Sequence, residues 1–157
     1  MTQAYSGGCQ CGAIRYRFTQ SPSGAHICHC RMCQKAFGAF YAPLVGGPRD
    51  SFEITRGALG TFMSSDQAER GFCPRCGTPL TFRYIDSDRI SVSIGSLDNL
   101  EAFPPEDQHG IESRLSWVND LGHLPDHPPT EGENEHADFI QSTNHQHPDH
   151  DTERWPE

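Results

Sequence analysis

Seven cysteines, grouped in three clusters, are the residues of this chain best suited to chemistry. The clusters are Cys9 and Cys11 in GGCQCG, then Cys28, Cys30 and Cys33 in CHCRMC, then Cys73 and Cys76 in FCPRCG. Zinc takes four ligands in a tetrahedron, and short spacings let one turn of chain present two thiolates to the same ion. An odd number of cysteines would leave one unpaired in a disulfide framework. We therefore interpret the cysteines as metal ligands.

The outer two clusters can together complete one four-thiolate site. On an extended segment both cysteines of the CxC pair project to one side, and the flanking glycines permit the bend that brings them together. In the CxxC pair, Pro74 presets the turn and Gly77 can adopt the left-handed conformation. Such a closed site has no vacancy and contributes folding energy. Spacing alone leaves other assortments open, for example Cys9, Cys11, Cys28 and Cys30 around one ion.

The central cluster supplies only three thiolates, which leaves a metal ion one protein ligand short. An open position is what zinc chemistry requires, so a substrate thiol could bind there and react as the thiolate. The alternatives are that His29, a carboxylate or a water completes a second structural site, or that these are buried thiols. We expect His29 to be a loop residue whose side chain points away from the cysteines.

Several cations and aromatic residues lie near the ligands, and most have a simpler interpretation than chemistry. Arg31, Lys35 and Arg75 are best read as solvated loop cations, although they could balance thiolate charge or receive a substrate carboxylate. Phe37, Phe40 and Tyr41 are more typical of core than of a pocket wall. We assign no chemical role to His109 or Trp117.

The elements that must position these cysteines are predicted to be short strands. Runs rich in β-branched and aromatic residues are separated by Gly, Pro, Asp or Ser, which favours a mainly β meander or sandwich. The runs are Ala13–Phe18, Ala39–Val45, Phe52–Thr55, Leu59–Met63, Leu80–Tyr84 and Arg89–Ile94. Helix is predicted only as a turn at Arg31–Phe37 and another at Asp98–Leu100.

Composition divides the chain into a domain and a tail. A length of 157 residues suits one domain, and we expect a single zinc-binding unit over residues 1–124. Residues 125–157 carry nine acidic residues, one arginine and five of the nine histidines, a net charge of −8 out of −9. This segment is polar and lacks apolar periodicity, so we expect a solvated, mobile tail; adventitious metal binding by its histidines is the alternative.

Charge and hydropathy exclude some classes of partner. The nearly neutral domain offers no basic face to phosphates, so nucleic acid is not expected. No window approaches the roughly 18 apolar residues that span a bilayer, and no secretory leader is evident. We therefore expect a cytoplasmic protein, in which seven cysteines do not form a disulfide framework.

Three cysteine motifs in order resemble a known family. The segments GGCQCGAIRY, CHCRMCQKAFGAF, SSDQAERGFCPRCGTPL and HGIESRLSWVNDLGHLP have the order and spacing typical of the glutathione-dependent formaldehyde-activating enzymes. The likeness spans roughly residues 5 to 128. It implies an Mss4-like β-tent fold and two zinc ions. By that resemblance Cys9, Cys11, Cys73 and Cys76 hold the structural zinc, and Cys28, Cys30 and Cys33 hold the catalytic zinc.

The resemblance also implies an activity. Family members add glutathione to formaldehyde to give S-hydroxymethylglutathione and are grouped with carbon–sulfur lyases for the reverse reaction. We therefore expect a carbon–sulfur lyase that acts on a thiol–aldehyde adduct, with a small thiol such as glutathione as partner. Two alternatives are a zinc-stabilised binding module without catalysis and a redox sensor that releases zinc on oxidation. A homodimer is compatible with the sequence.

Overall fold

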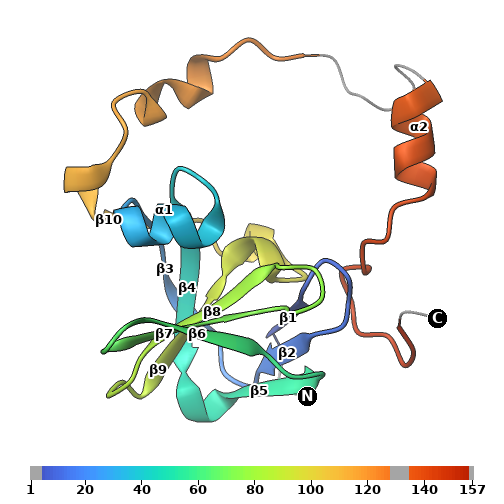
Figure 1. Cartoon of the computed structure of the whole chain (residues 1–157), viewed down its shortest axis with the longest axis horizontal. Coiled ribbons are helices and arrows are strands. Elements are labelled where there is room, and N and C mark those ends of the chain that lie inside the picture. The colour runs from blue at the N-terminus through green and yellow to red at the C-terminus, as the bar shows by residue number, and fades with distance from the viewer. Residues whose placement is uncertain (1–4, 128–134, 156–157) are drawn as a thin grey trace.

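The computed structural model describes residues 5–127 and 135–155, and this part of the chain is mostly β structure in two sheets (Figure 1). The smaller sheet has three antiparallel strands in the order β1 (Tyr5–Gly8), β2 (Arg15–Phe18) and β5 (Phe52–Arg56). The prediction of a mainly β fold is confirmed, and the architecture is consistent with an Mss4-like fold.

The larger sheet has seven strands. Their order is β10 (Asp107–His109), β3 (Ser23–Cys28), β4 (Ala42–Pro48), β9 (Arg89–Ser93), β8 (Pro79–Tyr84), β7 (Ala68–Phe72) and β6 (Gly60–Ser65). Strands β6 to β9 follow one another as antiparallel hairpins, whereas β10 pairs in parallel with β3. Two cysteine clusters therefore lie at strand ends of this sheet, after β3 and between β7 and β8.

Helix is a minor part of the described chain. The two α-helices are α1 (Arg31–Phe37) and α2 (Glu135–Ser142), and short 3-10 turns cover Arg49–Ser51, Ile94–Ser96, Leu100–Ala102, Ile111–Ser113 and Val118–His123. The prediction of a helical turn at Arg31–Phe37 is confirmed. It begins after Cys30, whose sulfur accepts a hydrogen bond from the Cys33 amide, and ends at Gly38 in the left-handed conformation.

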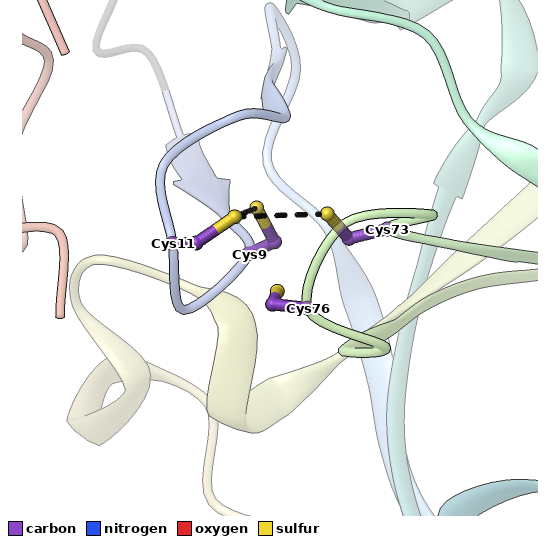
Figure 2. A group of neighbouring side chains, drawn as sticks. All are labelled: Cys9, Cys11, Cys73 and Cys76. Carbon is purple, nitrogen blue, oxygen red and sulfur yellow. Dashed lines mark hydrogen bonds between the residues drawn. The ribbon is translucent and has the colours of Figure 1, made fainter. Parts of the chain in front are cut away.

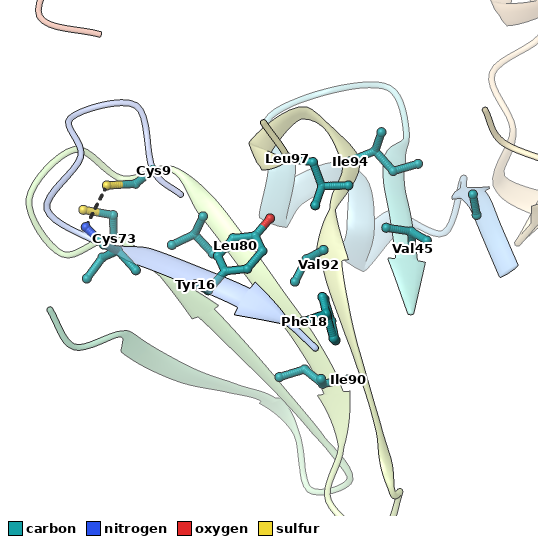
Figure 3. Close-up of a cluster of buried hydrophobic side chains, with 12 residues drawn as sticks. Cys9, Tyr16, Phe18, Val45, Cys73, Leu80, Ile90, Val92, Ile94 and Leu97 are labelled. Atoms are coloured by element: carbon teal, nitrogen blue, oxygen red, sulfur yellow. Dashed lines mark hydrogen bonds between the residues drawn. The ribbon is translucent and has the colours of Figure 1, made fainter. Parts of the chain in front are cut away.

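The main core lies between the two sheets (Figure 3). Tyr16 and Phe18 of β2 are fully buried in one cluster with Val45 of β4, Leu80 of β8 and Val92 of β9. Burial of each such side chain contributes about 1.5–3 kcal/mol. The approach is close enough to require Gly47, since a Cβ there would lie 2.6 Å from the Phe18 ring. This core holds the β1–β2 hairpin against the large sheet.

All six predicted strand runs contain or overlap a strand, but four strands have no counterpart among the predictions. Strand β1 is YSGG, β7 is AERGF, β3 begins SGAH and β10 is DQH. Each is poor in β-branched residues or contains glycine, so local propensity does not mark it. Pairing with neighbouring strands makes these segments extended.

The C-terminal segment returns to the β1–β2 hairpin (Figure 1). The His147 amide donates to the Gln10 carbonyl at 2.7 Å, and the Trp155 indole donates to the Cys11 carbonyl at 2.8 Å. His147 is buried, and its ring packs edge to face on Trp155. Asp151 binds Arg15 at 2.7 Å. Helix α2 and these contacts were not predicted from the sequence. The domain boundary at residue 124 and the mobility of residues 125–157 stay predictions. Residues 128–134 and 156–157 lie outside the described chain.

Candidate functional site

The CxC pair lies in the turn between β1 and β2. The Cys9 amide donates to the Ile14 carbonyl at 3.1 Å, and the Gly12 amide donates back to the Cys9 carbonyl at 3.0 Å. Gly12 has a φ of 69°, a conformation that suits glycine. The Ile14 amide also donates to the Cys9 sulfur at 3.2 Å. The tight turn thus holds both sulfurs on one side of the hairpin.

The CxxC pair occupies the turn between β7 and β8, with a similar local geometry. The Cys73 amide donates to the Thr78 carbonyl and the Gly77 amide to the Cys73 carbonyl, both at 2.9 Å. Gly77 has a φ of 80°, as its place in the motif predicted. The two turns are joined directly, because the Gln10 amide donates to the Thr78 hydroxyl at 3.1 Å.

The structure brings the four sulfurs of these turns together (Figure 2). All four lie within 4.8 Å of one another; Cys11 is 3.6 Å from Cys9 and 3.8 Å from Cys73. Four sulfurs bound to one zinc at about 2.3 Å would be separated by about 3.8 Å. The donor set and spacing therefore fit a tetrahedral metal ion, and this group could hold one.

The protonation chemistry of this group also fits a cation. Burial raises the pKa of Cys9 to about 12. Burial also disfavours the Cys76 thiolate, but hydrogen bonds from Thr78 and the backbone outweigh it and lower the pKa of Cys76 to about 6. Four neighbouring sulfurs thus do not all ionise unaided at neutral pH. A bound divalent cation would supply the missing positive charge.

The central cysteines form a second, separate group. Cys28 ends β3, Cys30 caps α1 and Cys33 lies within α1, and their sulfurs are within 4.8 Å of one another. Cys28 and Cys30 are grouped with Cys33, so the structure gives no support to a shared site with Cys9 and Cys11. Burial raises the pKa of Cys28 to about 12. Three donors could hold a metal ion and leave a position for an external ligand.

Arg70 of β7 is the cation that contacts this three-sulfur group. Its side chain is buried, one Nη donates to the Cys33 sulfur at 3.4 Å, and its guanidinium stacks on Phe82 at 5.0 Å. Among the described residues its Nε has no hydrogen-bond partner. A buried arginine needs an anion, and the Cys33 sulfur is the group that it contacts. The arrangement fits ionised thiols.

The cations flagged from the sequence lie elsewhere. Arg31, Lys35 and Arg75 are exposed, and Arg31 donates to the Gln34 side chain at 3.3 Å. Arg70 was missed because AERGF carries no metal-site signal. Arg70 contacts Cys33 of α1 only once the sheet that contains β7 has assembled. The solvated interpretation of Arg31, Lys35 and Arg75 agrees with their exposure.

The flagged ring side chains do not line the cavity that the cysteines face, with one exception. Phe37 is half-buried against Cys33 and its neighbours, and exposed Phe40 packs edge to face on Tyr41 and Trp117. His29 is completely buried, with its Nε2 2.9 Å from the Gln108 amide oxygen, and is outside both cysteine groups. His109 is the exception, since it lies at the cavity wall.

A cavity of about 510 Å³ opens over the three-sulfur group. Its wall includes all three central cysteines and none of the other four. Arg70, Arg83 and Arg89 also line it, whereas no carboxylate among the described residues does. Arg83 is paired with Glu69 at 2.8 Å. The described lining thus offers arginine side chains, and no carboxylate, to an anionic ligand.

In the described ranges, 5–127 and 135–155, the structure contains no helix with the length and apolar character needed to span a membrane. The expectation of a cytoplasmic location is not tested by this observation.

Known proteins resemble this chain in sequence and in fold. An uncharacterized lyase of Schizosaccharomyces pombe is 32% identical over 87 residues, which is 51% of this chain and 58% of that protein. The chain thus matches a little over half of the length of that relative. A crystal structure of a Rhodobacter sphaeroides protein has a TM-score of 0.54 at 21% identity, with 66% of this chain and 98% of that chain covered. This second likeness shows the fold.

A family model matches most of the domain that carries the cysteine groups. The model is described as glutathione-dependent formaldehyde-activating enzyme, and it matches residues 4–113, which include all seven cysteines. The match covers well over half of the chain. The protein therefore belongs to the glutathione-dependent formaldehyde-activating enzyme family.

Proposed function

We propose that this protein is a zinc-dependent enzyme of the carbon–sulfur lyase class that acts on the adduct of a thiol and an aldehyde. Its reaction would resemble the formation of S-hydroxymethylglutathione from glutathione and formaldehyde. Membership of the family and the lyase name of the yeast relative support this class. The free thiols fit a reducing, cytoplasmic setting.

The observation that carries the proposal is the unequal setting of the two cysteine groups. Cys28, Cys30 and Cys33 face a cavity, whereas the other four cysteines lie on two joined turns and line no part of that cavity. A four-thiolate shell is complete, so its ion would stabilise the fold. A three-thiolate shell leaves room for a substrate sulfur. We assign the structural zinc to the four-sulfur group and the catalytic zinc to Cys28, Cys30 and Cys33.

The cavity favours a thiol that carries carboxylates. Glutathione has two carboxylates, and both Arg89 and Arg83, the latter paired with Glu69, line the cavity. Arginine binds carboxylates through paired N–H donors. We propose that these two arginines receive the carboxylates of the substrate and hold its sulfur toward the cysteines.

In the proposed reaction the carbon–sulfur bond forms between the substrate sulfur and the aldehyde carbon, and the thiol proton ends on the aldehyde oxygen. When bound, zinc would lower the pKa of a coordinated thiol and so supply the nucleophile. Arg70 offsets the negative charge of the cysteine sulfurs from the buried side. Phe82 and Tyr84 contribute aromatic side chains to the same cavity wall.

Replacement of single cysteines tests the proposal. Cys30→Ser should lose about one zinc per chain, keep its circular dichroism spectrum, and lose both glutathione binding by calorimetry and adduct formation by NMR. Cys76→Ser, the matched control in the other group, should lose zinc and unfold at a much lower temperature. Full zinc retention and unchanged glutathione binding in Cys30→Ser would overturn the assignment.

Two other results would point to different functions. A wild-type chain that holds two zinc ions but neither binds glutathione nor forms the adduct would be a zinc-stabilised binding module. Reversible loss of zinc under mild peroxide, without turnover, would indicate a redox sensor.

A further inference from the structure

A second cluster of metal-ligating side chains includes two residues of the same cavity wall. His26, Asp107 and His109 have ligand atoms within 4.8 Å of one another. His26 and His109 line the cavity together with the three central cysteines. Two imidazoles and one carboxylate form a donor set that binds divalent transition metals. None of the three belongs to either cysteine group.

The sheet register explains why the three side chains converge. Strand β10 pairs in parallel with β3, so Asp107 lies opposite His26, and His109 lies opposite Cys28. Opposite residues of paired strands project to the same face, as do residues two apart on one strand. All four side chains therefore share one face at the edge of the large sheet. The end of β10 is packed closely on Cys30, since a Cβ at Gly110 would lie 2.7 Å from the Cys30 amide nitrogen.

A hydrogen bond at His26 Nδ1 leaves its Nε2 available to a metal ion. Its Nδ1 is 2.9 Å from the Gly24 carbonyl oxygen. A carbonyl only accepts hydrogen bonds, so Nδ1 carries the hydrogen and Nε2 has the free lone pair. Metal-binding histidines typically donate their other ring N–H to a carbonyl or carboxylate in this way. This contact is independent of the grouping of the three side chains.

The side chains of His109 and Asp107 have the spacing of two ligands on one ion. His109 Nε2 is 3.3 Å from Asp107 Oδ1, and the two imidazole rings meet edge to face at 4.7 Å. Two ligands bound to one zinc at about 2.0–2.1 Å lie about 3.3 Å apart in a tetrahedron. As a simple ion pair, the same contact would contribute little, because both side chains are more than half exposed.

We propose that His26, Asp107 and His109 bind a divalent transition-metal ion of the zinc, nickel or copper type, separate from the metal of the thiol group. Three protein donors leave coordination positions open toward the cavity. An oxygen of a molecule in the cavity, such as a carboxylate or a carbonyl, would occupy them. The cavity would then offer sulfur-bound metal at one place and nitrogen- and oxygen-bound metal beside it. The proposal does not depend on the enzymatic function, because a chain without turnover would still bind the ion.

The test is the zinc stoichiometry of the full-length, zinc-loaded chain. The zinc per chain is counted first as purified, and again after equilibrium dialysis against micromolar zinc. The variants are His26→Gln, His109→Gln and Asp107→Asn, and the matched control is His145→Gln in the C-terminal segment. Since the targeted side chains are half-buried or exposed, all variants should fold, which thermal unfolding will check.

Wild type and His145→Gln should bind one further zinc ion on dialysis, and His26→Gln, His109→Gln and Asp107→Asn should bind it at least tenfold more weakly. All five proteins should hold the same amount of zinc as purified. A further ion that is retained in His109→Gln, or lost equally in His145→Gln, would place it on other histidines and overturn the proposal. So would a loss of the zinc present on purification in His109→Gln, because His109 would then be a ligand of the thiol group.

Discussion

Replacement of Arg70 by methionine isolates the electrostatic role of a single buried cation. Arg70 contacts the Cys33 sulfur at 3.4 Å and stacks on Phe82, and methionine keeps much of its apolar volume. Burial raises the pKa of Cys33, and the Arg70 hydrogen bond opposes this rise. Loss of the guanidinium should therefore raise the Cys33 pKa further and weaken metal binding at the three-sulfur group.

The magnitude follows from the contact that is lost. A hydrogen bond to a charged group contributes about 1.5–3 kcal/mol, which corresponds to about a 10- to 100-fold weaker zinc affinity. Loss of the Phe82 stacking should cost about another 0.5–2 kcal/mol of folding stability, but not of zinc affinity. Arg70→Lys keeps the charge without the planar stack, so its zinc affinity should fall between those of wild type and Arg70→Met.

Competition with a coloured zinc chelator measures the zinc affinity of the three-sulfur group, which should be the weaker of the two cysteine groups because it has one thiolate fewer. Arg83→Met is the matched control, because Arg83 lines the same cavity but is paired with Glu69. Thermal unfolding monitored by circular dichroism separates instability from loss of metal. Equal zinc affinities in wild type and Arg70→Met, or an equal loss in Arg83→Met, would refute the argument that Arg70 stabilises ionised thiols.

Three further predictions concern the four-sulfur group and the C-terminal segment that lies on it. Burial raises the pKa of Cys9 to about 12, so zinc must displace its proton in order to bind. Chelator competition between pH 6 and 8 should therefore show about tenfold tighter zinc binding per pH unit for each proton released. A zinc affinity that does not change with pH would contradict this. Gly12→Ala should displace Trp155, since the added Cβ would clash with the Trp155 ring. Because Gly12 has a φ of 69°, the change should also lower the free energy of unfolding by about 1–3 kcal/mol. Trp155 fluorescence in a Trp117→Phe background would report the displacement, and an unchanged spectrum would count against the docked C-terminal segment. Burial and then the charges of Arg15 and Arg56 lower the pKa of His147 despite the opposing charge of Asp98. Docking of the C-terminal segment should therefore be fully stable above pH 6.5 and weaken as the pH falls through the lower folded pKa. The expected result is faster proteolysis of this segment at pH 5 than at pH 7, with no such difference in His147→Gln.

Local features of the fold were predictable, and the reason is that they depend on a few neighbouring residues. Helix α1 follows a cap at Cys30 and ends at Gly38, and Gly77 takes the positive φ that the CxxC turn requires. Strand β1 was not predictable, because its sequence YSGG has little β propensity and is extended only through its pairing with β2 and a bridge to Leu97.

The candidate site, too, has features that the sequence predicted and features that only the structure revealed. The spacing of the cysteines within each motif was enough to predict metal ligands, since two thiolates on one turn need no distant partner. The joining of the CxC and CxxC turns, and the cavity over Cys28, Cys30 and Cys33, required the structure. The zinc content of each group and its role stay predictions.

By itself, the sequence determined that the seven cysteines could bind metal, that the chain is mainly β, and where the acidic charge is concentrated. Only the tertiary structure decided which distant groups meet: Arg70 with Cys33, His26 with Asp107 and His109, and Trp155 with the Cys11 carbonyl. The physical reason is that these contacts join residues up to 144 positions apart. Their partners are set by strand order and register, which arise from packing of the whole sheet and leave no mark in a short stretch of sequence.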